Sequence, residues 1–407
     1  MLFIRIKSML KNAYQKDTIA AQFPLHKLPI VAFVEVIKTM TIQQRVKLAL
    51  SSPEMEMLLQ IARPKPGTVI LDLKGEESAV IVYFETELLC GDDHDQMEWN
   101  RDVPKSDLAP WLNPELSTYE NTINVYRRIL KIFPTNFFKL AIHLTDSNQS
   151  IIREMLAVPD FQNFKEIMIF GEKVDKENLD LVMETFEKDR SIVLEVKDMP
   201  DGYFHENMFK FIAVDYNASR WIKVEHLFSM RNVLDVKLSR SSFTATDMNT
   251  FFKYWANCDH DMFIKMDVTS FDKPTSLPKE IMFDGVVTLI SYRNGDRFFL
   301  ISCKPGTSRK SQLMSIFYRR DCREVYLTCR PIDQPFPHNR RPAEPWRREF
   351  EVLKILHQKK NLEGRLQELQ EGTIAQGEIQ KQLRELRNDL EERDVQLGGF
   401  IPEMLPV

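Results

Sequence analysis

The apolar residues near the amino end follow the period of an α-helix in three short runs. Residues 23–63 hold these runs, and breaks at Thr41–Gln44 and Ser51-Ser52-Pro53 separate them. Spacings of three and four place the apolar residues of a run on one side of a helix. Serine followed by proline at the second break is typical of a helix start. The pattern predicts three short helices, whose apolar positions are Phe33, Val36, Ile37, Met40, Val46, Leu48, Leu50, Met55, Leu58 and Leu59.

The segment 68–135 connects these helices to the rest of the chain. Thr68–Leu73 and Ala79–Glu85 are rich in β-branched residues and flank a glycine-containing turn, which predicts a β-hairpin. The next stretch is acidic and punctuated by proline, so we expect a surface loop. Its cluster at residues 92–95 has metal-ligand residue types, but adjacent residues rarely converge on one ion and a solvated loop is favoured. Ser117–Phe133 has one apolar face and predicts a helix.

Short apolar strands recur in the segment 136–318, with helix-like stretches between most of them. One strand and one helix every 20 to 30 residues, roughly, is typical of a leucine-rich-repeat-like solenoid, and parallel strands need connections of about that length. The fold class we predict is therefore α/β (α+β), with this segment as an irregular leucine-rich-repeat-like domain. A two-layer α/β sheet is the alternative. The predicted strand centres are Ile142, Ile169, Leu194, Val214, Val236 and Met266.

The last part of the chain carries two further patterns. Residues 319–345 combine scattered arginines with prolines, which predicts an extended basic linker. Residues 346–397 show apolar side chains seven apart in a charge-rich background, which predicts a C-terminal coiled-coil helix. Because the second seam position is mostly polar, a single helix lying on a partner is the alternative. The expected seam consists of Ile355, Leu362, Leu369, Leu383, Leu390 and Leu397.

Composition narrows the function classes. The chain has 407 residues, a formal net charge of −4 and a pI near 6.1, which argues against a general nucleic-acid binder. No apolar stretch approaches the roughly 20 residues that span a membrane, and we expect no secretory signal at the amino end. The five cysteines are widely spaced and odd in number, which favours a reducing compartment, the cytoplasm or the nucleus.

The sequence offers no catalytic signature. It contains no G-x-S-x-G, no P-loop and no H-E-x-x-H, and its 13 glycines form no phosphate-binding cluster. We therefore expect a protein that is not an enzyme and that needs no cofactor and no metal.

The helical segment 23–63 resembles an F-box, closest to the F-boxes of protein families expanded in nematodes. The resemblance lies in Phe23-Pro24-Leu25, in Leu28-Pro29, in the helix with Val36-Ile37, and in the Leu48-x-Leu50-Ser pattern. It implies a three-helix module that docks on the Skp adaptor of a cullin–RING ubiquitin ligase. The third helix departs from the family by lacking the usual aromatic residue. The adaptor-binding residues that the resemblance implies are Pro24, Leu25, Leu28, Pro29, Ile37, Met40 and Leu48.

A second resemblance lies further along the chain. Asp247-x-Asn249-x-Phe251-Phe252-Lys253-x-Trp255, with Trp221 upstream and a hairpin around Asn294-Gly295 downstream, resembles the F-box-associated (type 2) domain of the same proteins. That domain is taken to recruit a protein client, so the resemblance implies the substrate-recognition subunit of an SCF-type ligase. The alternative is a scaffold protein without ligase function that forms homodimers through its C-terminal coiled coil. The spacing of Trp255 with Phe251 and Phe252 favours a place in the core.

Overall fold

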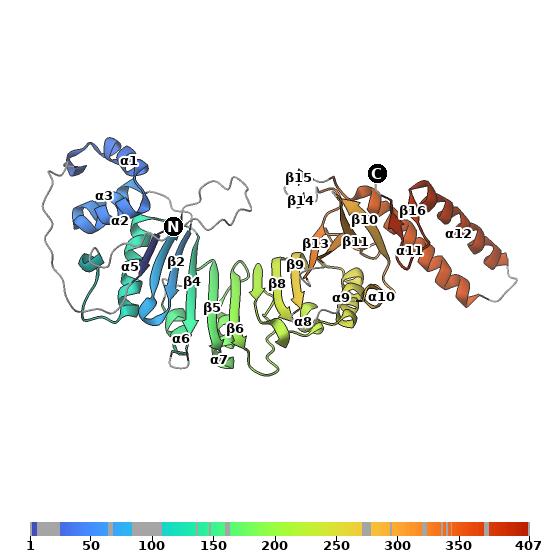
Figure 1. Cartoon of the computed structure of the whole chain (residues 1–407), viewed down its shortest axis with the longest axis horizontal. Coiled ribbons are helices and arrows are strands. Elements are labelled where there is room, and N and C mark those ends of the chain that lie inside the picture. The colour runs from blue at the N-terminus through green and yellow to red at the C-terminus, as the bar shows by residue number, and fades with distance from the viewer. Residues whose placement is uncertain are drawn as a thin grey trace. The chain divides into compact units, whose positions relative to one another are not determined.

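The computed structural model shows a mixed α/β protein. It divides into two compact units, Met1–Thr185 and Phe186–Val407, and Figure 1 colours their elements by residue number. The structure describes residues 2–5, 25–63, 68–83, 108–135, 137–145, 148–158, 163–270, 278–293, 295–319, 324–334, 337–338, 341–342, 344–369 and 374–405. The acidic cluster at residues 92–95 and the predicted adaptor contact Pro24 lie outside these residues.

Three helices follow the turn η1 (Leu25–Lys27) in the first unit: α1 (Ile30–Thr39), α2 (Ile42–Ser51) and α3 (Pro53–Ala62). Their caps explain where they begin. The Thr41 hydroxyl accepts a hydrogen bond from the Gln44 amide at 3.2 Å, and the Gln44 side chain accepts one from the Thr41 amide at 2.8 Å. Ser52 caps α3 by accepting from the Met55 amide. These side chains satisfy amide groups that a helix start leaves without partners.

The sheet of the first unit has the strand order β1-β3-β2-β4-β5. The predicted hairpin is present, since β2 pairs antiparallel with β3, while β2–β4 and β4–β5 pair in parallel. The helix α5 (Thr118–Ile132) packs on β2 and β3. The remaining elements of this unit are β1 (Leu2–Arg5), β2 (Thr68–Leu73), η2 (Gly75–Glu77), β3 (Ala79–Tyr83), η3 (Ala109–Trp111), β4 (Phe138–Leu144), α6 (Ile151–Leu156), β5 (Glu166–Lys173) and α7 (Lys176–Thr185).

The second unit changes from parallel to antiparallel pairing along its sheet. Its strand order is β6-β7-β8-β9-β13-β12-β11-β10-β17-β16, with parallel pairs from β6 to β9 and antiparallel pairs from β9 to β10. Its strands are β6 (Ser191–Asp198), β7 (Ala213–Tyr216), β8 (Val233–Ser241), β9 (Phe263–Ser270), β10 (Thr288–Arg293), β11 (Asp296–Ser302), β12 (Leu313–Arg319), β13 (Glu324–Arg330), β14 (Pro337–His338), β15 (Arg341–Pro342), β16 (Val395–Gln396) and β17 (Glu403–Met404). Its helices are η5 (Ser219–Trp221), α8 (Val224–Leu227), α9 (Ala245–Asn257), α10 (Lys279–Met282), α11 (Arg347–Glu368) and α12 (Ile374–Glu392).

The six predicted strand centres all lie on buried positions of β4 to β9. Trp255 is also buried, as expected, and forms part of the core beneath α9. Trp221 is half-buried, and its ring packs against Tyr203 and Tyr216. The alternation of parallel strands and connecting helices is thus the arrangement that the apolar pattern predicted for this part of the chain.

The predicted linker 319–345 is wrong in its middle. Glu324–Arg330 forms β13, which pairs with both β9 and β12 inside the sheet. Val325, Leu327 and Cys329 are buried on alternate positions of this strand. The surrounding arginines and prolines obscured a two-residue alternation that is typical of a half-buried strand.

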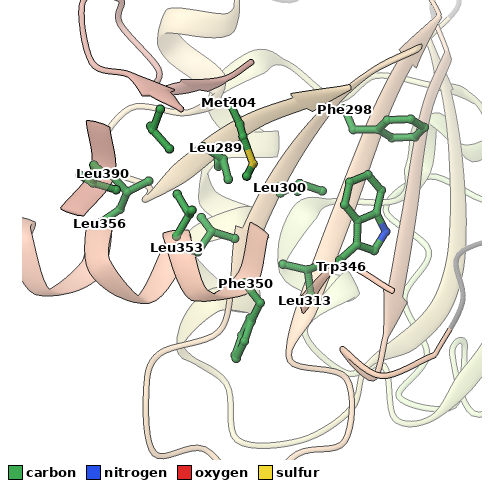
Figure 2. Packing of buried hydrophobic residues seen from close by; sticks show 12 residues of the cluster. Leu289, Phe298, Leu300, Leu313, Trp346, Phe350, Leu353, Leu356, Leu390 and Met404 are labelled. Atoms are coloured by element: carbon green, nitrogen blue, oxygen red, sulfur yellow. The ribbon is translucent and has the colours of Figure 1, made fainter. Parts of the chain in front are cut away.

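The antiparallel strands β10 to β13 are covered on both faces. Phe299 points to one face, where its ring stacks on Phe283, and Phe283 stacks in turn on Phe252 of α9. The neighbouring Phe298 points to the opposite face, because successive side chains of a strand alternate. There it meets Trp346, which precedes α11, in a core that includes Leu289, Leu300, Leu313, Phe350 and Leu353 (Figure 2).

The predicted coiled-coil helix 346–397 is wrong as one continuous helix. It is interrupted between α11 and α12, which pack against each other as a helical hairpin within one chain (Figure 1). The five residues between the two helices include Gly372, and glycine lowers helix stability by about 1 kcal/mol relative to alanine. The apolar stripe therefore has an intramolecular partner.

Candidate functional site

The first candidate site is the three-helix module, which we define as residues 25–63. Its core consists of side chains from all three helices, including Phe33 and Ile37 of α1, Val46 of α2 and Leu59 of α3, each at most 1% exposed. Arg45 holds α1 and α2 together, since its side chain donates to the Ile37 carbonyl at 2.9 Å and to the Lys38 carbonyl at 3.1 Å. Burial lowers the pKa of the Arg45 guanidinium. The module is thus a folded platform with a defined angle between its first two helices.

The predicted adaptor residues fall into different environments of this module. Pro29 is exposed, whereas Ile37 is 1% exposed and belongs to the core shared by the three helices. Ile37 therefore packs in the core of the module and does not form part of its solvent-exposed surface. The other described members of the set are half-buried: Leu25, Leu28, Met40 and Leu48.

Four large apolar side chains of the module face solvent, and sequence reasoning missed all of them. Ile30 and Val31 of α1 are 46% and 72% exposed, and Met57 and Ile61 of α3 are 54% and 55% exposed. The two helices are in contact. A signal existed in the sequence, because Met57 and Ile61 are four apart and out of phase with the buried Met55 and Leu59, so α3 has a second apolar stripe.

Single exposed apolar side chains are common on protein surfaces, and the described residues contain others, such as Phe204 and Phe400. The module differs because four of them lie within 32 residues, on two helices in contact. Several exposed apolar side chains on neighbouring helices favour a role in binding another protein. Chemically the module can dock a partner. It offers no cluster of titratable groups, and no group of His, Cys, Asp and Glu in the described part of the chain could hold a metal ion.

The second predicted site, the coiled-coil seam, is occupied within the chain. Leu362 and Leu383 are buried with Ile379 between α11 and α12, and Leu369 packs against the same cluster. Leu390 is fully buried in the core of Figure 2, and Ile355 and Leu397 pack against that core. The six seam residues thus contribute to two intramolecular clusters.

A third feature is a set of alternating charges on β7, β8 and β9. The strand register places Asp215 beside Lys237, Lys237 beside Asp267, and Asp235 beside Lys265. Lys237 lies 3.8 Å from Asp215, and Lys265 lies 3.3 Å from Asp267. Burial raises the pKa of Asp267, while Lys265 opposes this shift. The lysine side chains are 47% and 49% exposed, so this face meets water with its charges largely compensated.

Comparison with models of protein families, with curated proteins and with solved structures finds no match for this chain. None of the helices in the described part of the chain is long and apolar enough to cross a membrane.

Proposed function

We propose that this chain is the substrate-recognition subunit of an SCF-type cullin–RING ubiquitin ligase. In this proposal the module is an F-box that docks on a Skp-type adaptor, and the leucine-rich-repeat-like α/β domain recruits a protein client in the cytoplasm or nucleus. The observation that carries the proposal is the exposure of Ile30, Val31, Met57 and Ile61 on two contacting helices of a module whose sequence resembles an F-box.

The proposed mechanism is bridging and assigns no catalytic step to this chain. Binding adaptor and client at the same time raises the effective concentration of the client near the charged ubiquitin-conjugating enzyme. The exposed apolar side chains would supply the buried centre of the adaptor interface. Leu28 and Pro29, just before α1, would fix the direction in which the chain enters that interface.

Binding to purified Skp-type adaptor, measured by calorimetry with the full chain, tests the proposal. We expect micromolar or tighter binding, and we expect the double variant Val31→Asp, Met57→Asp to lose about 100-fold or more in affinity, since charges would enter the apolar centre. Replacing Leu28 and Pro29 by alanine together should also abolish co-purification with the adaptor.

The matched control is Ile374→Asp, because Ile374 is an even more exposed apolar residue, 89% exposed, at the start of α12. It should bind the adaptor like the unmodified chain. Absence of binding by the unmodified chain, or equal binding by the Val31, Met57 double variant, would reject the docking role. The seam that would support a dimerising scaffold packs within the chain.

A further inference from the structure

The three-helix module is tied to the sheet of its own unit by one ion pair between α3 and α5. Arg128 of α5 donates from Nη1 to Oε2 of Glu56 at 2.7 Å. The Glu56 side chain is only 11% exposed, while that of Arg128 is 40% exposed. The two residues are 72 positions apart, so the pair joins segments that are distant in the sequence.

A third residue completes this contact. The Arg128 guanidinium lies 5.7 Å from the centre of the Trp111 ring, within the range in which a cation is attracted to an aromatic face. Trp111 is 6% exposed and belongs to η3, just before α5. We call Glu56, Arg128 and Trp111 the clamp. Because α5 packs on β2 and β3, the clamp connects the module to the sheet through α5.

The burial of Glu56 means that the clamp favours one orientation of α3 on α5. A carboxylate that is almost enclosed needs a partner, and removing that partner is far more unfavourable than breaking an exposed ion pair. A shifted placement of α3 on α5 that kept Glu56 enclosed but broke the pair would leave a buried carboxylate without its partner. The contact therefore favours one placement of α3 on α5 over a set of loosely related placements.

We propose that Arg128 is a positioning residue for adaptor docking, which with Glu56 and Trp111 makes the module and the β2–β4–β5 sheet one rigid body. An adaptor on the module would then be held in a fixed direction relative to that sheet. The inference rests on the proposed function for its consequence, but the rigid body itself does not depend on an adaptor. The opposite case is a module that moves freely relative to that sheet.

Hydrogen exchange of the full chain, followed by mass spectrometry, tests the rigid body. In the Arg128→Ala variant we expect exchange in peptides covering α3 to rise about tenfold or more, because a local contact has been opened, while α7 stays unchanged. Arg153→Ala is the matched control, since its pair with Glu177 is 3.5 Å long and exposed on both sides. Unchanged exchange in α3 of Arg128→Ala would overturn the inference.

Measurements of adaptor binding and of ubiquitin transfer distinguish a positioning role of Arg128 from a role in folding alone. Arg128→Ala should bind the adaptor within about twofold of the unmodified chain, because the docking surface is intact. In a reconstituted ligase that contains Arg128→Ala, ubiquitin should be attached to lysines at more positions of this chain than in the unmodified protein. Arg128→Lys should restore much of the original pattern of modified lysines. Loss of adaptor binding together with helix content would show that Arg128 only keeps the module folded, which would also overturn the inference.

The two proposals fail in different ways. If the unmodified chain binds no adaptor, the ligase function is rejected, while the exchange experiment still decides whether the clamp makes a rigid body. If the adaptor binds and the exchange in α3 of Arg128→Ala does not change, only the positioning role is rejected.

Discussion

The two helical regions near the ends of the described chain use their apolar residues differently. The C-terminal hairpin buries its seam between α11, α12 and the neighbouring strands. The module instead leaves four large apolar side chains in solvent on α1 and α3. Both regions have apolar residues at helical spacing in the sequence. The difference teaches that an apolar stripe indicates burial, but that the partner, from the same chain or another, depends on which segments are close by.

The largest expected effect is a difference between the two regions in how much a substitution lowers the free energy of unfolding. Leu390→Ala should lower the free energy of unfolding by about 3 to 4 kcal/mol, because Leu390 is fully buried and its loss leaves a cavity. Val31→Ala should change it by less than about 0.5 kcal/mol, since Val31 is already in solvent. Urea unfolding of both variants measures this. Equal losses in the two variants would mean that Val31 also packs against this chain.

The next effect concerns how the C-terminal hairpin is fixed to the sheet. Glu349 of α11 is 4% exposed and pairs with Arg293 of β10 at 2.6 Å, and it also accepts from the Ser291 hydroxyl. Arg293→Ala should cost about 3 kcal/mol, because it leaves a buried carboxylate without its cation. The double variant with Glu349→Leu should recover part of this loss. A loss under 1 kcal/mol in urea unfolding of Arg293→Ala would show that Glu349 is solvated when Arg293 is removed.

A smaller effect is the pH dependence of the same region. His357 of α11 has its Nε2 3.0 Å from the Ser302 hydroxyl, and burial, followed by the charge of Lys360, lowers the pKa of His357. The folded state therefore binds fewer protons than the unfolded state. The stability that this histidine contributes is complete above its ordinary pKa of about 6.5 and is lost as the pH falls.

For one proton the loss cannot exceed about 1.4 kcal/mol per pH unit. Unfolding by urea at several pH values between 7.5 and 5.0 should therefore show a shallower decline for His357→Gln than for the unmodified chain. Burial also lowers the pKa of His226, in α8. The decline in His226→Gln is therefore compared with that in His357→Gln. A parallel decline in His357→Gln and the unmodified chain would contradict the assignment.

The sequence located the strands β4 to β9 but neither β13 nor the pairing of the strands. The centres of β4 to β9 could be located because buried parallel strands are short apolar runs, and Met266 or Ile169 stands out from its polar flanks. The strand β13 was missed because Arg323 before it and Arg330 at its end suggested a linker. Only the fold reveals that Leu327 lies between Met266 and Ile316 on neighbouring strands.

The candidate site shows the same limit at the level of single residues. The motif placed Leu28 and Pro29 at the entrance of the module, but it could not distinguish the buried Ile37 from the exposed Val31 on one helix. Both are apolar, and their environment depends on how α1 rests on α2 and α3. The side chain of Arg45, which fixes that angle through two backbone carbonyls, carries no signal in a periodicity analysis.

The smallest effect should be the same in both regions. Lys38 pairs with Glu35 on α1 at 2.7 Å, and Lys354 pairs with Glu351 on α11 at 2.8 Å, with every side chain at least half exposed. Because solvent and side-chain entropy offset such pairs, Lys38→Ala and Lys354→Ala should each change the free energy of unfolding by less than about 0.5 kcal/mol. Urea unfolding at low and high salt measures both. A loss above 1 kcal/mol for Lys38→Ala alone would place that lysine in a contact that the exposed pair does not explain. It would then be harder to distinguish a module with a solvent-exposed surface from a C-terminal hairpin whose apolar seam is buried.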